Sequence, residues 1–296
     1  MTGTNGVLRI ACAHDLAYTP QYVGLALGLF EDVGLRLDMV QYPPGVAGVV
    51  DTIPRGAADL LLGSLLYAVR LHETGTDTHI VTQSNQQTRN VLMVRPGAAE
   101  GFAWEDLRGR AILVYPGEAP TAWAAFQDAL FQHGLTCGDV KLIFGYTAAD
   151  AVDEFVRGVG DFLLIDAEAA LDDRLAHAVA VSDGVGKLPW SIYSTSGEVV
   201  RTRGEDLNAF AIALSRAQSW IRSHDAAETA EVISPSFPQY AQPQVARILK
   251  RYLELDLWPE SSKVQLDQVL RWEAGLRRGG LIGIGKPLTE VITVHV

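Results

Sequence analysis

The sequence predicts an α/β protein made of two similarly wound lobes, followed by a helical segment near the C-terminus. Three observations lead to this prediction. Residues 8–40 have the pattern of a strand, a helix and a second strand, which is typical of a parallel βαβ unit. A turn and strand at 157–166 copies the form of an earlier one at 55–64. The chain of 296 residues is also long for a single hydrophobic core.

The first βαβ unit contains a strand at 8–12, a helix at 18–30 and a strand at 35–39. The first strand is apolar and too short for a helix. Pro20 is tolerated in the first helical turn, because its missing amide would have no intrahelical partner there. Apolar and polar residues alternate in the second strand, as expected for a strand with one buried face and one face more exposed to water. In open α/β sheets ligands bind outside the carboxyl ends of such strands, so we expect the site there.

The remaining elements follow the same plan in both lobes. In lobe one we expect helices at 46–53 and 65–72 and strands at 60–62 and 80–84. In lobe two we expect strands at 91–94, 111–115 and 140–144, a turn and strand within 157–166, and helices at 121–133 and 148–156. A strand at 190–194 then returns to lobe one, followed by helices at 207–222, 226–233, 243–252 and 261–277. The polar segment 83–90 is expected to line a cleft and to cross toward lobe two.

Composition narrows the class of partner. The formal net charge is -11, and no cluster of lysine or arginine forms a basic stripe. This argues against nucleic acid or an anionic membrane surface as the main partner. No apolar run is long enough to span a membrane, and residues 1–11 lack the features of a secretory signal. We therefore expect a cytoplasmic protein from the sequence as written, or a periplasmic or extracellular one if the N-terminus has been trimmed.

Several segments together resemble the type II periplasmic-binding-protein fold in its sulfonate, taurine and thiamine-pyrimidine branch, the NMT1/THI5-like proteins. These segments are Tyr22 to Leu35, Arg55 to Ser64, Asp106 to Arg110, and Leu207 to Ile221. The resemblance implies two lobes joined by two crossing segments, with a small molecule enclosed in the cleft between them. The lobe boundaries we expect are 1–88 with 192–296, and 89–191. Transport is not implied, because the branch also includes a thiamine pyrimidine synthase and a biphenyl-sulfinate desulfinase.

The chain departs from each known role in this branch. Transport receptors carry an export signal, and the pyrimidine synthase has a cysteine-rich run, whereas this sequence shows neither. In the desulfinase a cysteine follows the first strand, and here Asp15 holds the comparable position while Cys12 lies within the strand. We expect a small-molecule ligand and no cofactor, and an ABC permease as partner if the protein is exported. The oligomeric state is left open.

If the lobes close as the resemblance implies, loop residues of both would contact the ligand. The ligand-binding residues expected on this basis are Tyr18, Gly45, Ser64, Gln83, Asn85, Glu118, Thr121, Trp123, Tyr146, Asp166 and Tyr193. Aromatic rings with a few polar groups suit a flat, polar and mostly uncharged ligand. Three candidate carboxylates, Asp15, Glu118 and Asp166, favour an amine or aminopyrimidine-like group over a sulfonate or phosphate. In the alternative interpretation, Asp166 caps a helix and Glu118 faces water.

A cytoplasmic enzyme with the same cleft is the competing hypothesis. It would be a lyase or a desulfinase-like enzyme that cleaves a carbon–heteroatom bond, or an enzyme of cofactor or secondary-metabolite biosynthesis. Its candidate catalytic residues are His14 and Asp15, as a general base held by a carboxylate. Adjacent side chains usually point apart, so an ordinary loop histidine is the alternative. Cys12 is expected to be a buried, unactivated thiol. No metal site is expected, since the acids and histidines at 72–79 lack a matched ligand spacing.

Overall fold

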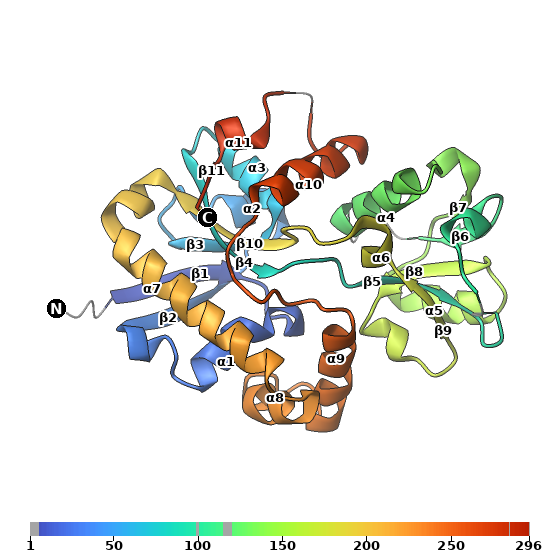
Figure 1. Ribbon diagram of the computed structural model, residues 1–296, viewed down its shortest axis with the longest axis horizontal. Coiled ribbons are helices and arrows are strands. Elements are labelled where there is room, and N and C mark those ends of the chain that lie inside the picture. Colours follow the sequence, from blue (N-terminus) through green and yellow to red (C-terminus); the bar gives the residue numbers. More distant parts are fainter. Residues whose placement is uncertain (1–5, 99–100, 115–119, 284, 296) are drawn as a thin grey trace. The chain divides into compact units, whose positions relative to one another are not determined.

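The computed structural model describes residues 6–98, 101–114, 120–283 and 285–295 (Figure 1). Contacts divide the chain into two compact units. Unit 1 contains Met1–Gln87, Pro189–Trp272 and Gly285–Val296, and unit 2 contains Thr88–Leu188 and Glu273–Ile284. The short segment Glu273–Ile284 therefore packs with unit 2, whereas the sequence pattern places it in lobe one.

Unit 1 contains a six-stranded mixed sheet in the order β11-β4-β10-β3-β1-β2. Its strands are β1 (Gly6–Cys12), β2 (Leu35–Gln41), β3 (Leu60–Ser64), β4 (Thr78–Asn85), β10 (Ser191–Ser196) and β11 (Thr293–Val294). β1 is parallel to both β2 and β3, while β10 lies antiparallel between β3 and β4. The carboxyl ends of β1, β2, β3 and β4 therefore lie at one edge of the sheet.

Helices cover both faces of this sheet. They are α1 (Thr19–Ala26), α2 (Gly45–Val50), α3 (Leu65–Glu73), α7 (Gly197–Arg222), α8 (Ala226–Ile233), α9 (Gln242–Glu254) and α11 (Leu288–Val291), with 3-10 turns η1 (Leu16–Tyr18), η2 (Glu31–Val33) and η6 (Ser234–Ser236). Leu60 and Leu62 are buried in a cluster with side chains of α7, and Leu61 is buried in a second cluster with side chains of α2 and α3. This alternation is the two-residue period of a strand buried on both faces.

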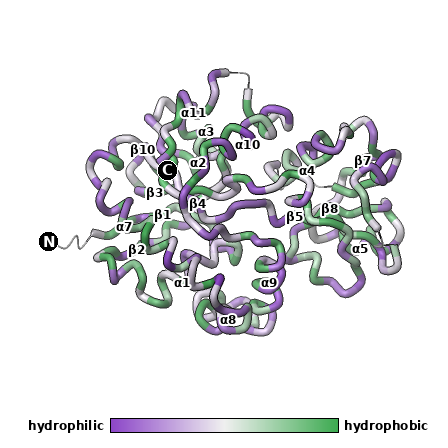
Figure 2. The backbone as a smooth tube through the Cα atoms, viewed as in Figure 1, coloured by the Kyte–Doolittle hydropathy of each residue, from purple (hydrophilic) through white to green (hydrophobic). Residues whose placement is uncertain are grey.

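Unit 2 contains a five-stranded sheet in the order β7-β6-β8-β5-β9. Its strands are β5 (Asn90–Val94), β6 (Ala111–Leu113), β7 (Lys141–Ile143), β8 (Phe162–Asp166) and β9 (Ala176–Ala180). Its helices are α4 (Pro120–Gln132), α5 (Ala148–Val156) and α6 (Val181–Val185), with 3-10 turns η3 (Trp104–Leu107), η4 (Cys137–Asp139) and η5 (Ala169–Leu171). The last long helix, α10 (Leu266–Arg278), begins in unit 1 and ends in unit 2. Figure 2 shows the chain as hydrophilic between β4 and β5, where it passes from one unit to the other.

The repeated turn and strand has the same hydrogen bonding in both units. In unit 1 the Asp59 carboxylate accepts from the Arg9 amide at 2.8 Å, and the Asp59 amide donates to the Arg9 carbonyl. In unit 2 Asp161 and Ala111 exchange the same two bonds, with 2.9 Å to the carboxylate. The similarity between 55–64 and 157–166 therefore reflects one local hydrogen-bonding arrangement. In both copies an aspartate holds the start of a strand against the neighbouring parallel strand.

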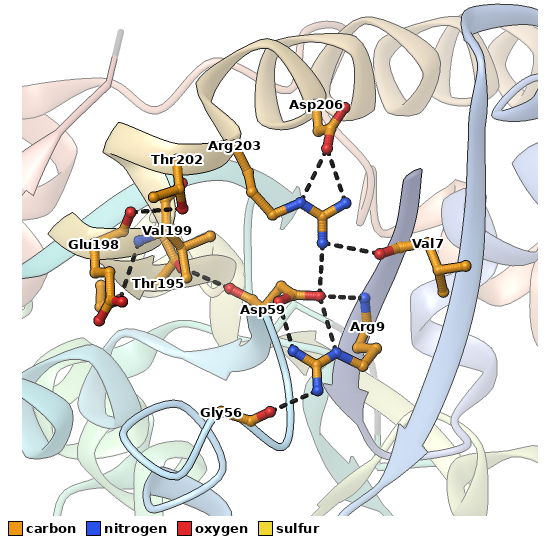
Figure 3. Close-up of polar contacts among 11 residues, drawn as sticks. Val7, Arg9, Gly56, Asp59, Thr195, Glu198, Val199, Thr202, Arg203 and Asp206 are labelled. Atoms are coloured by element: carbon orange, nitrogen blue, oxygen red, sulfur yellow. Dashed lines mark hydrogen bonds and ion pairs between the residues drawn. The ribbon is translucent and has the colours of Figure 1, made fainter. Parts of the chain in front are cut away.

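Among the residues that the structure describes, the unit 1 copy of this arrangement extends into an ionic network and the unit 2 copy does not (Figure 3). The Asp59 carboxylate also accepts from the guanidinium groups of Arg9 and Arg203, at 2.9 Å in each case. Arg203 donates further to Asp206 and to the Val7 carbonyl, both at 2.8 Å. Arg203 has a non-helical backbone, φ -135° and ψ 23°, inside α7. The network therefore fixes a kink in α7 against the amino ends of β1 and β3.

The helix expected at 18–30 is shorter in the structure. α1 ends at Ala26, and the chain turns through Gly28, whose φ of 69° favours glycine. The ring of Phe30 then packs back on Gly24, where a Cβ atom would lie 2.4 Å from the ring. Apolar periodicity alone does not reveal this return. The sequence pattern also misses β9, α6, α11 and β11, all of which are short.

Candidate functional site

The carboxyl edge of the unit 1 sheet brings together residues from four chain segments. Asp15 follows β1, Tyr42 follows β2, and Ser64 and Asn85 are the last residues of β3 and β4. Tyr67 lies in the first turn of α3, directly after β3. We call this group, with Tyr18 of η1, the unit 1 edge.

The phenols of Tyr42 and Tyr67 in the unit 1 edge remain protonated. Burial raises the pKa of Tyr42 well above its usual value, and the neighbouring Tyr18, Tyr67 and Cys12 raise it further. Burial also raises the pKa of Tyr67. The rings of Tyr42 and Tyr67 meet edge to face with centroids 6.0 Å apart. These phenols are therefore neutral hydrogen-bonding groups on an aromatic surface at physiological pH.

Gly63 makes room for both rings. A Cβ atom at this position would lie 2.3 Å from Cδ2 of Tyr67 and 3.0 Å from the hydroxyl oxygen of Tyr42. The Tyr42 hydroxyl donates to the backbone carbonyl of Leu62, which precedes Gly63 in β3. The absence of a side chain at Gly63 thus lets two tyrosines pack over the end of β3.

Cys12 and Tyr193 lie beneath this surface, in the core. Tyr193 is fully buried, and its hydroxyl donates to the Gln21 amide oxygen at 3.1 Å. The Gln21 amide nitrogen lies 3.9 Å from the Cys12 sulfur. Burial raises the pKa of Cys12 to about 11, so its thiol is not an activated nucleophile. This confirms the expectation for Cys12, and it gives Tyr193 a packing and positioning role.

The two residues expected to act as acid and base have structural partners. His14 Nε2 lies 2.8 Å from the Ser236 carbonyl oxygen, and its ring stacks on Phe237 with centroids 4.4 Å apart. The Asp15 carboxylate accepts from the Ala17 amide at 2.8 Å and caps η1. His14 therefore anchors the segment after α8, and Asp15 orders the loop that carries Tyr18.

Most polar side chains at the end of β4 and directly after it bind backbone groups of neighbouring loops. Gln83 is buried and donates to the Lys263 carbonyl at 2.8 Å. Gln86 donates to the Asp256 carbonyl at 2.9 Å, and Gln87 to the Leu255 and Asp256 carbonyls. These amides hold the loops around α9 and α10 against β4, which explains a polar stretch that the sequence pattern assigns to cleft lining.

Asn85 differs from these glutamines. It is 1% exposed, and its side-chain oxygen has no hydrogen-bond donor among the residues that the structure describes. A buried acceptor without a donor is unfavourable, so such a group calls for a specific explanation. The remaining predicted residue of unit 1, Gly45, begins α2 with a φ of 76°, which favours glycine.

The carboxyl edge of β8 carries the charged groups of unit 2. The Asn90 amide donates to the Asp166 carboxylate at 2.5 Å, across the antiparallel pair of β5 and β8. The Arg89 guanidinium lies 3.6 Å from Asp166 and 3.3 Å from Glu168. The partners of the Asp166 carboxylate are therefore side chains of unit 2, Asn90 and Arg89. The alternative that Asp166 caps a helix does not account for these contacts. We call Arg89, Asn90, Asp166 and Glu168 the unit 2 edge.

An aromatic group lies at the start of α4 in the same unit. The ring centroid of Trp123 is 5.9 Å from that of Phe126 and 6.3 Å from that of Phe144. Phe144 follows β7 and is 52% exposed. Thr121 lies two residues before Trp123 in the first turn of α4, and Tyr146 lies two residues after Phe144. Glu118, also expected at the site, lies outside the described residues.

Sequence reasoning misses several of these residues. The sequence pattern assigns Tyr67 to helix packing and does not single out Tyr42, Arg89, Glu168 or Phe144 as site residues. All five lie within four residues of a strand end in chain order. A rule that includes every aromatic or charged residue at that distance would find them.

Other site classes receive no support from the described part of the chain. Both Cys12 and Cys137 are free thiols. No group of three or more histidine, cysteine or acidic residues in the described ranges could hold a metal ion. Among these residues no helix has the length and apolar character needed to cross a membrane.

Comparison with known proteins places the chain in a family. The model of the NMT1/THI5 like family matches residues 16–227. The chain belongs to this family. Among its relatives, YtlA of Bacillus subtilis, whose name describes it as a candidate binding protein, is 23% identical over 245 residues, which are 81% of this chain and 73% of YtlA.

Solved structures of similar fold agree with the family assignment. The periplasmic aliphatic sulphonate binding protein SsuA from Escherichia coli has a TM-score of 0.76 and 17% identity, with 97% of each chain covered. The desulfurization enzyme DSZB has a TM-score of 0.65 and 15% identity, covering 97% of this chain and 96% of its own. The expected two-lobed, type II periplasmic-binding-protein fold is thereby confirmed.

Proposed function

We propose that this protein binds a small polar molecule that carries an aromatic ring or a protonated amine, at the carboxyl edges of its two sheets. The observation that carries the proposal is the unit 1 edge. Protonated tyrosines supply an aromatic surface there, and Asp15 and Asn85 supply acceptor oxygens in the adjoining segments. Aromatic faces and acceptors suit a flat cation or N–H donor.

The charges of unit 2 favour the same ligand class. Arg89 carries the guanidinium group of the unit 2 edge. This group is already close to the carboxylates of Asp166 and Glu168. Its positive charge is thus offset before any ligand arrives. A sulfonate would need unshared cationic or N–H donors. We therefore propose that the ligand differs in charge from the aliphatic sulphonate after which the Escherichia coli protein SsuA is described.

Binding without turnover is the function we favour, even though an enzyme shares the fold. His14 is engaged by Ser236 and Phe237, and the Cys12 thiol is buried with a raised pKa. General base or nucleophilic catalysis would need these groups to be available to a substrate. The Asp15 carboxylate likewise has a structural partner, since it accepts from the Ala17 amide.

We further propose that the unit 1 edge and the unit 2 edge each recognise this ligand class. A periplasmic or extracellular location and delivery to a membrane permease are the finer parts of this proposal. The periplasmic location stated for the Escherichia coli protein SsuA supports the first of these.

Titration calorimetry with benzylamine tests the proposal, using one variant in each unit. Tyr67→Leu removes a ring from the unit 1 edge, and Trp123→Leu removes one from the aromatic group of unit 2. Each should weaken binding by about tenfold, since a buried aromatic contact contributes about 1.5 kcal/mol. Phe102→Leu, which changes a ring packed on Phe162 at the amino end of β8, is the control. Equal affinity in all four proteins would refute the proposed site.

A further inference from the structure

Unit 1 contains a hollow that is separate from its carboxyl edge. Its volume is about 280 Å³, and it lies between α7, β4, the loop at Ser262 and the segment after β11. Apolar side chains form much of its lining, including Val81 of β4 and Val200 and Leu207 of α7. The volumes of ligand pockets usually begin at about 300 Å³, so this hollow is of a size that suits a small ligand.

The kink in α7 shapes this hollow. Arg203 leaves the helical conformation and donates to Asp59 and Asp206, as Figure 3 shows. Gly204, the next residue, lines the hollow, and a Cβ atom built on it would meet nothing within 4 Å. The helix is thus held in a bent form by buried ion pairs, with open space beside the bend.

The polar groups of the hollow carry one formal positive charge. Lys263 and Asn208 line it, and neither side chain has a hydrogen bond or ion pair within the described ranges. His295 also lines it, with Nε2 3.1 Å from Nδ1 of His79. Burial and the neighbouring His79 lower the pKa of His295, which keeps its ring neutral. None of the described lining residues is acidic.

We propose that this hollow is a second binding site, for a small monocarboxylate with a short apolar body. The apolar lining would enclose the body, and the Lys263 ammonium and Asn208 amide would bind the carboxylate. The site is independent of the proposed amine site at the strand edges.

Titration calorimetry with octanoate, and with octanamide as the uncharged analogue, tests this proposal on the full chain. Octanoate should bind the wild-type protein more tightly than octanamide. Lys263→Gln should weaken octanoate binding about fivefold, the effect of losing a partly exposed ion pair, and should leave octanamide unchanged. Because Lys263 is exposed, this variant is expected to fold normally.

A pair of variants at Gly204 tests the position of the site. Gly204→Leu should weaken both ligands about tenfold by filling the space, whereas Gly204→Ala should bind nearly as the wild type does. Tyr67→Leu at the unit 1 edge should leave octanoate affinity unchanged, which separates this site from the proposed amine site. Absence of octanoate binding, equal affinity after Lys263→Gln, or an effect of Tyr67→Leu as large as that of Gly204→Leu would overturn the proposal.

Discussion

Replacing Asp59 with asparagine should destabilise unit 1 far more than the equivalent change in unit 2. The Asp59 side chain is 8% exposed and accepts from two guanidinium groups as well as the Arg9 amide. Asp161 holds the corresponding position in the repeat, is exposed, and accepts from the Ala111 amide. The repeat therefore offers Asp161→Asn as a matched control.

The expected size of the effect follows from the burial of the partners. Removing one member of a buried ion pair typically costs about 3–5 kcal/mol. Arg9 is 39% exposed and Arg203 21%, so solvent compensates part of this loss. We expect Asp59→Asn to lower the free energy of unfolding by about 2–3 kcal/mol. Asp161→Asn should cost at most about 1 kcal/mol, the value of one exposed hydrogen bond.

Urea denaturation followed by circular dichroism measures both variants, and its pH dependence adds a second test. Burial raises the pKa of Asp59, but the hydrogen bonds and charges of Arg9 and the charge of Arg203 outweigh it, so the pKa is lowered overall. A depressed pKa stabilises the fold above the unfolded value of about 3.9, and this stability is lost as pH falls through the folded pKa. The difference between wild type and Asp59→Asn should therefore shrink below about pH 4. Equal destabilisation by Asp59→Asn and Asp161→Asn at pH 7 would refute the reasoning.

The site and its surroundings give three further predictions. Gly63→Ala should displace the Tyr67 ring and weaken benzylamine binding at least about fivefold, measured by calorimetry, because its Cβ atom would lie 2.3 Å from that ring. Native Cys12 should resist alkylation at pH 8 and become reactive in urea, as followed by mass spectrometry, since its pKa is about 11; rapid native labelling would contradict this. His14→Ala should lower the melting temperature of unit 1 by several degrees through loss of the Phe237 stack, and it should leave benzylamine affinity within about twofold; abolished binding would restore a ligand role for His14.

Much of the fold could be predicted from the sequence, because the buried strands repeat a simple pattern. The expected strands at 8–12 and 60–62 lie within strands of the structure, the turn and strand expected within 157–166 contains β8, and the helix expected at 226–233 agrees with α8. The prediction was weakest where distant packing decides the outcome. α1 stops early because Phe30 packs on Gly24, and β11 is ordered by pairing with β4 far away in the chain.

Predicting the site was harder, since a strand-end position does not reveal where a side chain points. Gln83 was expected to face ligand, but its amide donates to the Lys263 carbonyl. Tyr67 was expected to pack, and Gly63 leaves room for its ring over the end of β3. Such outcomes depend on which distant backbone groups need a partner, and no local sequence pattern records that.

The central claim, that the strand edges recognise a small molecule with an aromatic ring or a protonated amine and not an anion, is tested most directly by competition in native mass spectrometry. Equimolar benzylamine and phenylmethanesulfonate, which differ chiefly in charge, would be offered to the purified protein. We predict a mass shift corresponding to bound benzylamine, which Tyr67→Leu and Trp123→Leu both diminish. Preferential retention of phenylmethanesulfonate would contradict the account, because it would show that the site selects an anion.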